Sequence, residues 1–260
     1  MADHAFPDGA FPTIVAHRGA SSTHPENTLA SFRAALALGA PVVELDVRLT
    51  ADAVPVVMHD ADVARTTGGE GLVHELTAER IAELNAGTPD APEPVPTLRQ
   101  ALELMSGAAA VALEIKNVPG DPGFAEDERI VEAAHEELVS SGFEGPALVL
   151  SFNPRSLAAS KAIDPAVPTG FLTTDLVPPP EALAHAVETG HDLVLPRAGS
   201  LIPAGPAFVA EAHAEGVRVG TWTVDDPRTL RMLLDRGVDA IATNDPAMAL
   251  AVLAGHARAS

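Results

Sequence analysis

The sequence predicts an α/β protein in which parallel strands, each followed by a helix, close into a TIM (β/α)8 barrel. Short β-branched runs alternate with Ala- and Leu-rich helical stretches about eight times, which predicts parallel strands joined by helical crossovers. Runs such as "ALVLSF" are continuously apolar, as expected for strands that are buried on both faces. The chain has 260 residues, close to the roughly 250 that such a barrel needs. We therefore expect one domain over 1–260.

An open, doubly wound sheet is the alternative architecture for this pattern. Many such folds place a Gly-rich dinucleotide loop after the first strand, but "AHRGASS" stands there in this chain. This loop and the number of strand–helix units favour the barrel.

The elements follow in order along the chain. The expected strands are 13–17, 41–47, 54–59, 110–116, 146–152, 167–172, 192–196, 217–222 and 239–243. The expected helices are 27–39, 97–106, 126–141, 154–162, 180–189, 206–215, 226–235 and 246–254. Short polar residues near three helix starts are candidate caps: Asn27, Asn153 and Asp225. Glycines near three helix ends suit the left-handed conformation: Gly39, Gly190 and Gly237.

One strand candidate is surplus to a barrel of eight. "VPVVMH" (54–59) follows "PVVELDV" (41–47) over a link too short for a parallel crossover. We therefore predict a hairpin that returns His59 to the end of the second barrel strand. The irregular stretch 60–96, with one short helix at 77–84, is then a small insertion after that strand.

Composition limits the partners. The net charge is −20, which disfavours nucleic acid and anionic membrane surfaces, so we expect neither nucleic-acid binding nor stable membrane association. Cysteine is absent, and the first residues lack the pattern of a signal peptide. The expectation is a soluble, cytoplasmic protein, and the sequence leaves its oligomeric state open.

Polar residues recur at the predicted strand ends, where such barrels hold their reactive groups. Side chains two apart on a strand share a face, so Glu44 and Asp46 point the same way, as do Glu114 and Lys116. Crowded carboxylates inside a barrel repel one another unless a cation neutralises them, and a hard divalent cation such as Ca²⁺ or Mg²⁺ prefers oxygen ligands. The alternative is a purely structural set of ion pairs with Arg18, Arg48 or Lys116.

Two histidines also lie at strand ends. His17 follows "TIVA" and His59 ends "VPVVMH", so the pair can face each other across a bound substrate and exchange protons near neutral pH. The remaining histidines fall in loops or helices, and we expect most of them at the surface. The plain alternative is that each strand-end histidine is a hydrogen-bonded structural residue.

These residues together resemble the glycerophosphodiester phosphodiesterase family. The resemblance runs from "HRGASSTHPENTLASF" through "VVELDVRLTADAVPVVMHDADVARTTGGEG", "VPTLRQALEL", "LEIK", "SF" and "TWTV" to "ATNDP". It spans residues 17 to 246, and the combination is far more specific than any single piece. It implies a TIM barrel with a small insertion after the second strand.

The resemblance also implies roles for the matching positions. Glu44, Asp46 and Glu114 would bind one Ca²⁺ or Mg²⁺. Glu26 of "PENT" would border that site and is a further possible ligand, directly or through a water or an adjacent ligand. His17 and His59 would be the acid/base pair. Arg18 and Lys116 would contact the phosphate, and Trp222 would line the pocket against the glycerol carbons.

The substrate implied is a small glycerophosphodiester, cleaved to glycerol-3-phosphate and an alcohol. Alternative readings are a phosphodiesterase acting on lysophospholipids or phosphoinositides, a non-catalytic phosphate-ester-binding barrel, and a metal-dependent barrel lyase or aldolase. The low aromatic content, 3%, and the lack of an amphipathic membrane-facing stretch disfavour the first, and the histidine pair disfavours the other two. One departure from the family pattern is Ala53, which replaces a glycine and would cost roughly 1 kcal/mol if its φ is positive.

Overall fold

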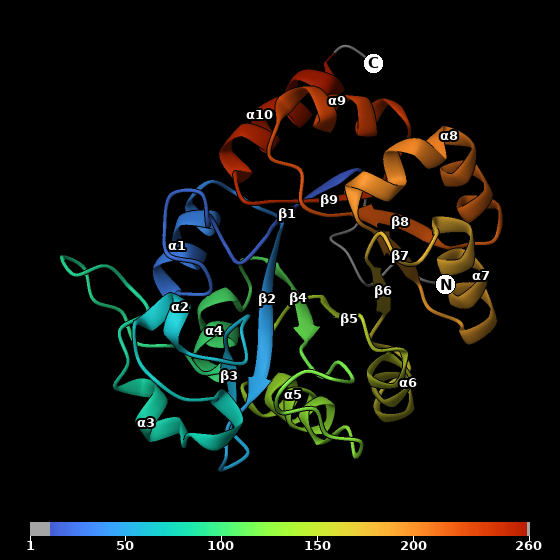
Figure 1. Cartoon of the computed structure of the whole chain (residues 1–260). Coiled ribbons are helices and arrows are strands. Elements are labelled where there is room, and N and C mark those ends of the chain that lie inside the picture. The colour runs from blue at the N-terminus through green and yellow to red at the C-terminus, as the bar shows by residue number, and fades with distance from the viewer. Residues whose placement is uncertain (1–10, 259–260) are drawn as a thin grey trace.

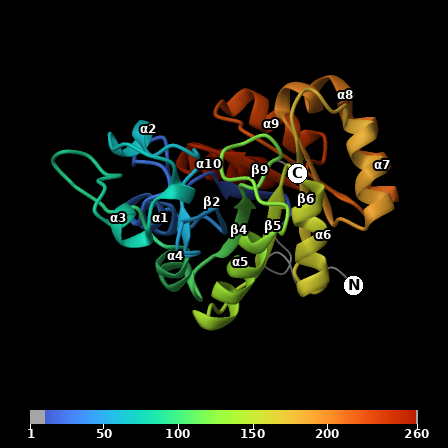
Figure 2. The ribbon, with the colours of Figure 1, turned by 60° about the horizontal axis from the view of Figure 1, so that its bottom comes forward.

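The computed structural model describes residues 11–258 and confirms the closed barrel. Nine strands form one sheet in the order β1-β9-β8-β7-β6-β5-β4-β2-β3, and a further pairing of β1 with β2 closes it. The strands are β1 (Thr13–Ala16), β2 (Val42–Leu49), β3 (Pro55–Val57), β4 (Ala110–Ile115), β5 (Ala147–Ser151), β6 (Thr169–Thr173), β7 (Leu193–Pro196), β8 (Arg218–Thr221) and β9 (Ala240–Thr243). The barrel pairings are parallel, and only β3 pairs antiparallel, with β2. Figure 2 shows the strands enclosed by the helices.

The expected helices are present with small shifts at their ends. They are α1 (Leu29–Ala37), α4 (Leu98–Met105), α5 (Arg129–Ser140), α6 (Pro154–Ile163), α7 (Pro179–Thr189), α8 (Ala198–Ala214), α9 (Pro227–Asp235) and α10 (Pro246–Ala257). Helix α8 begins eight residues before the expected start. It consists of two helical segments separated by Gly205, which has a non-helical φ of 75° and lies between two prolines, and only the second segment was expected. Among the described residues, no helix is long and apolar enough to cross a membrane.

Strand alternation divides the core into two layers. One set of side chains fills the barrel interior, including Val42, Ala112 and Leu150. The alternate set, including Val43 and Leu113, packs against the helices. Because residues two apart share a face, any polar residue in step with Val42 on β2 or Ala112 on β4 points into the barrel.

The predicted hairpin is confirmed, and it leads into the insertion. Val57 of β3 pairs with Val47 of β2. Ala53 in the hairpin turn has a φ of 60°. A glycine at this position, as in the family pattern, would adopt such a positive value more readily. The insertion carries α2 (Ala64–Thr67), η1 (Val73–Glu75) and α3 (Ala78–Ala82) around a small apolar cluster of its own. Figure 1 shows α2 and α3 beside the β2 edge of the barrel.

Two of the three predicted polar caps are wrong. Asn153 caps α6 by accepting from the amide of Arg155. Thr28, rather than Asn27, caps α1, and Asp226, rather than Asp225, caps α9. When two cap-forming residues are adjacent, the sequence leaves the helix start uncertain by one residue. In both helices the residue that does not cap makes a tertiary contact instead. The three glycines at helix ends all have positive φ: Gly39, Gly190 and Gly237.

Two histidines that we expected at the surface are buried. His135 is 6% exposed on α5 and His191 is 4% exposed before β7. Each bonds a hydroxyl, His135 that of Ser160 and His191 that of Thr169. Their hydroxyl partners satisfy one ring nitrogen each, which allows a neutral imidazole to be buried.

Candidate active site

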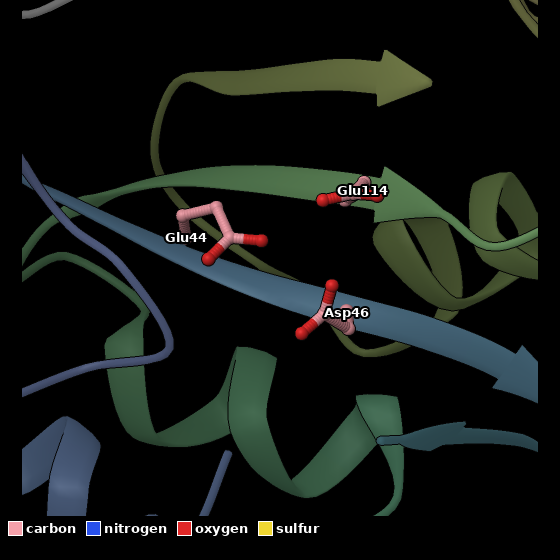
Figure 3. A group of neighbouring side chains, drawn as sticks. All are labelled: Glu44, Asp46 and Glu114. Carbon is pink, nitrogen blue, oxygen red and sulfur yellow. The ribbon is translucent and has the colours of Figure 1, made fainter. Parts of the chain in front are cut away.

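Three carboxylates meet inside the barrel. Parallel pairing sets Asp46 of β2 beside Glu114 of β4, and Glu44 lies two residues before Asp46 on the same face. One ligand oxygen from each residue lies within 4.8 Å of the others. Figure 3 shows the three side chains extending from these neighbouring strands. The residues are 3%, 0% and 6% exposed in chain order, so little water screens their mutual repulsion.

Two cations partly neutralise this group. The Arg18 Nε lies 3.1 Å from Asp46 Oδ2, and the Lys116 Nζ lies 3.0 Å from Asp46 Oδ1 and also contacts Glu114. Glu44 accepts only the backbone N–H of Arg18, at 2.9 Å. Its second oxygen, Oε1, is buried with no hydrogen-bond partner among residues 11–258. The ion-pair alternative thus applies to Asp46 and Glu114 and leaves Glu44 unneutralised.

The pKa shifts follow this asymmetry. Burial, and then the charges of Asp46 and Glu114, raise the pKa of Glu44 well above its usual value. Burial acts in the same direction on Asp46, but Lys116 and Arg18 outweigh it and hold the pKa of Asp46 well below its usual range. One carboxylate therefore lacks a positive partner, and the oxygen donors match what a hard divalent cation binds.

His17 has a neutral amide as its partner. Its Nδ1 lies 2.7 Å from Asn244 Oδ1. The orientation of Asn244 follows from Asp225, whose carboxylate accepts from Asn244 Nδ2 at 2.7 Å. The amide oxygen must then face His17, so Nδ1 carries the hydrogen and Nε2 is the free acceptor of the neutral ring. Burial, and then the charge of Arg18, lower the pKa of His17.

His59 has a carboxylate as its partner. Its Nδ1 lies 2.6 Å from Asp60 Oδ1. Burial, together with the charges of Lys116 and Arg18, lowers the pKa of His59, although the charge of Asp46 and the hydrogen bond to Asp60 act in the opposite direction. A carboxylate on Nδ1 stabilises the imidazolium form, which can donate a proton from Nε2. The two histidines therefore differ in the proton that each can offer.

A chain of ion pairs joins the second histidine to the carboxylate group. Arg65 of α2 contacts Asp60 and lies 2.7 Å from Glu26, and Glu26 lies 2.9 Å from Arg18. Glu26 thus borders the three carboxylates through Arg18 and does not join their group. Asn27, the expected helix cap, donates from Nδ2 to Asp46 at 2.8 Å.

Part of this set lines one cavity in the barrel mouth. It is bounded by both histidines, Arg18, Glu44, Glu114, Lys116 and Trp222, and its floor is aliphatic. The Trp222 Nε1 donates to the carbonyl of Leu195 at 3.0 Å, and its ring meets that of Phe152 edge-on at 5.4 Å. The cavity therefore combines charged side chains with an apolar lining.

Sequence reasoning assigned no role to several supporting residues. Asn244 and Asp60 lay inside the segments "ATNDP" and "HD" that carried the resemblance, and their position beside the histidines was the available signal. Arg65 and Phe152 also lay inside segments of the resemblance, but the residues they contact depend on how the insertion and the β5 end fold over the barrel.

Comparison with known proteins decides the family. A profile of the Glycerophosphoryl diester phosphodiesterase family matches residues 17–248. The chain belongs to this family. The glycerophosphodiester phosphodiesterase of Caldanaerobacter subterraneus subsp. tengcongensis is 37% identical over 243 residues, covering 90% of this chain and 94% of that protein. The glycerophosphodiester phosphodiesterase of Bacillus altitudinis is 31% identical over 247 residues, covering 92% and 97% of the two chains.

A solved structure supports the same family assignment. An Oleispira antarctica phosphodiesterase, determined in complex with the product sn-glycerol-3-phosphate, superposes with a TM-score of 0.84. The two chains are 28% identical, and the match covers 94% of this chain and 97% of that one. The protein is thus a phosphodiesterase of the glycerophosphoryl diester family, and the predicted barrel is the fold that its relatives share.

Proposed function

We propose that the protein hydrolyses glycerophosphodiesters to sn-glycerol-3-phosphate and an alcohol, using one divalent cation and two histidines. The observation that carries this proposal is the meeting of three carboxylates with two differently partnered histidines at one cavity. The family match supports the reaction class, and the product bound to the Oleispira relative supports the substrate class.

The cation would be held by Glu44, Asp46 and Glu114. The unpartnered Oε1 of Glu44 supports this assignment, because a buried carboxylate oxygen needs a positive or hydrogen-bonding neighbour. Three carboxylates against the charges of Arg18 and Lys116 leave one negative charge. A divalent ion, Ca²⁺ or Mg²⁺, reverses that sign, and the single charge of a phosphodiester then balances it. Such an ion polarises a phosphoryl oxygen and lowers the pKa of a bound hydroxyl.

His17 is the general base in this proposal. Its Nδ1 hydrogen is committed to Asn244, so the unprotonated Nε2 accepts a proton from the nucleophile. That nucleophile is the glycerol 2-hydroxyl or a water molecule, and phosphorus NMR distinguishes them, since only the first route forms a transient cyclic phosphate. The lowered pKa of His17 keeps the ring neutral at pH 7, as a base must be.

His59 is the general acid. Burial lowers the pKa of His59 as well, so its protonated ring is the minor form near pH 7. Asp60 stabilises that form, and Nε2 donates its proton to the oxygen of the leaving alcohol. Arg18 and Lys116 would neutralise the phosphate, and Trp222 would pack against the glycerol carbons. In each case the side chain lines the cavity in which the ester would lie.

Release of sn-glycerol-3-phosphate tests the proposal. Purified protein is given glycerophosphoethanolamine with EDTA, Mg²⁺ or Ca²⁺ in parallel. We expect release only with a cation, and a loss of at least about 10²-fold in kcat for His17→Ala and His59→Ala, the usual contribution of an acid or base. Full activity after thorough chelation would refute the cation assignment. A folded protein that binds the diester but releases no product would point to a non-catalytic binding barrel.

A further inference from the structure

A second cavity adjoins the one already described. It lies between the carboxyl end of β2, η1 and the segment that joins β4 to α5. Lys116 lines both cavities, and its Nζ lies 3.0 Å from Asp46 Oδ1. Lys116 therefore links the second cavity to the carboxylate group.

The second cavity has a basic wall in a strongly acidic protein. Arg48, His74, Lys116 and Arg129 line it, and none of its described lining residues is acidic. The net charge of the chain is −20, so a concave surface bearing only basic ionisable groups departs from the rest of the molecule. Such a wall attracts anions because its charges converge on one concave space.

Arg48 is the buried member of this wall. The residue is only 7% exposed, and its Nε donates to the backbone carbonyl of His59 at 2.8 Å. Within the described part of the chain it has no carboxylate at ion-pair distance, whereas Arg18 and Lys116 both have one. Burial lowers the pKa of Arg48, and the more distant charge of Asp121 offsets this only in part. A buried guanidinium without a close counterion is suited to bind an anion.

The other two basic side chains also retain unused donors. Arg129 is 63% exposed at its side chain, and its Nε lies 3.8 Å from Asp127, beyond hydrogen-bond distance. The His74 ring packs against Gly123, where an added Cβ would lie 3.1 Å from the ring, and this contact holds it at the cavity wall. Both side chains approach the cavity from segments other than β2, so the wall is formed from several sides.

We propose that this cavity receives the alcohol part of the substrate and selects alcohols that carry an anionic group, a carboxylate or a second phosphate. The proposal rests on the proposed function. Lys116 places the phosphodiester at the boundary of the two cavities, and Arg48 is bonded to the backbone of the histidine that faces the leaving alcohol. A quaternary ammonium group would meet like charges there, and Phe124 is the one Phe, Tyr or Trp among the described lining residues.

Two substrates that differ by one carboxylate test this proposal. Glycerophosphoserine carries the carboxylate and glycerophosphoethanolamine lacks it. With the cation present, we expect kcat/KM to favour the serine ester by about tenfold, the size of one well-placed charged contact. Arg129→Gln should reduce this preference by about threefold, because the contact between Arg129 and the substrate carboxylate would be partly exposed to solvent. Arg129→Lys should retain most of the preference.

Arg48→Gln should reduce the preference further, provided that its thermal unfolding matches that of the wild type. Arg80→Gln, which removes an exposed arginine of α3 outside the cavity, is the matched control and should leave the ratio unchanged. Equal kcat/KM values for the two esters, or a ratio that is unaffected by Arg129→Gln, would overturn the proposal while leaving the proposed function intact. Failure to hydrolyse either ester with Mg²⁺ or Ca²⁺ would instead count against the proposed function.

Discussion

Replacing Glu44 by Gln should stabilise the protein without a cation and destabilise it, relative to the wild type, with one. Glu44 faces Asp46 and Glu114, with ligand oxygens within 4.8 Å. At that distance and an effective dielectric constant of about 20, two like charges repel by about 3.5 kcal/mol. Arg18 and Lys116 offset most of the charge on the other two carboxylates, and the raised pKa of Glu44 allows protonation to relieve part of the repulsion, so we expect a net gain of about 1 to 2 kcal/mol.

Thermal unfolding at pH 8 measures both parts of this prediction. In EDTA, Glu44→Gln should raise Tm by about 2 to 6 °C, given about 2 to 4 °C per kcal/mol for a chain of this size. With cation at about a thousand times its Kd, the wild type should gain about 4 kcal/mol of stability. The variant lacks one of the three ligands, so it should show only a small part of that gain. The order of the two Tm values therefore reverses when the cation is added.

Glu211→Gln on the exposed face of α8 is the matched control, since it removes one negative charge outside the site. It should move Tm little in either condition. Two results would refute the reasoning: a Glu44→Gln variant less stable than the wild type in EDTA, or one that keeps the full cation-induced increase. The first would mean that repulsion among the carboxylates is already relieved, and the second that Glu44 is no ligand.

Three further perturbations test other contacts. Arg65→Gln should lower kcat by about tenfold with little change in KM, because Asp60, the partner of His59, loses the arginine that positions it. Arg65→Lys should restore only part of this activity, and an unchanged kcat in steady-state assays would contradict the positioning role. Burial, and then the charge of His185, lower the pKa of His191 to about 4, so this residue contributes stability above its unfolded pKa of about 6.5 that is lost as the pH falls toward 4. Between pH 7.5 and 4.5, the unfolding free energy of the wild type in urea should therefore fall by about 2 kcal/mol relative to that of His191→Leu. A constant difference between the two proteins would argue against a buried neutral ring. Ala53→Gly should raise the unfolding free energy by up to about 1 kcal/mol, since φ is 60° there, and a loss of stability would show that the turn is unstrained.

Strand and helix periodicity in the sequence determined the architecture. The alternation of apolar runs and helical stretches predicted the barrel, and the short link between "PVVELDV" and "VPVVMH" predicted the antiparallel hairpin. These features depend on local side-chain spacing and on connection length, both of which are written directly in the chain. The position of Glu44 and Asp46 on one face of β2 likewise follows from their spacing of two residues in the sequence.

Local pattern could not choose between adjacent cap-forming residues. Asn27 and Thr28 can each begin a helix, and Thr28 does so because the Asn27 amide donates to Asp46, nineteen residues away. The same limit applied to α8, whose helix was expected only from residue 206, whereas the structure has a further helical segment from Ala198 before a break at Gly205.

The tertiary structure alone decided which groups become partners. Glu44 is left without a counterion because Lys116 reaches Asp46 and Glu114. His17 acquires an amide partner from the far end of the chain, at Asn244, whereas His59 has the carboxylate of its neighbour Asp60. The sequence names the residue types and their strand positions. Their charge balance and proton placement arise only when segments more than two hundred residues apart close the barrel, because electrostatic interactions depend on distance in space and on burial.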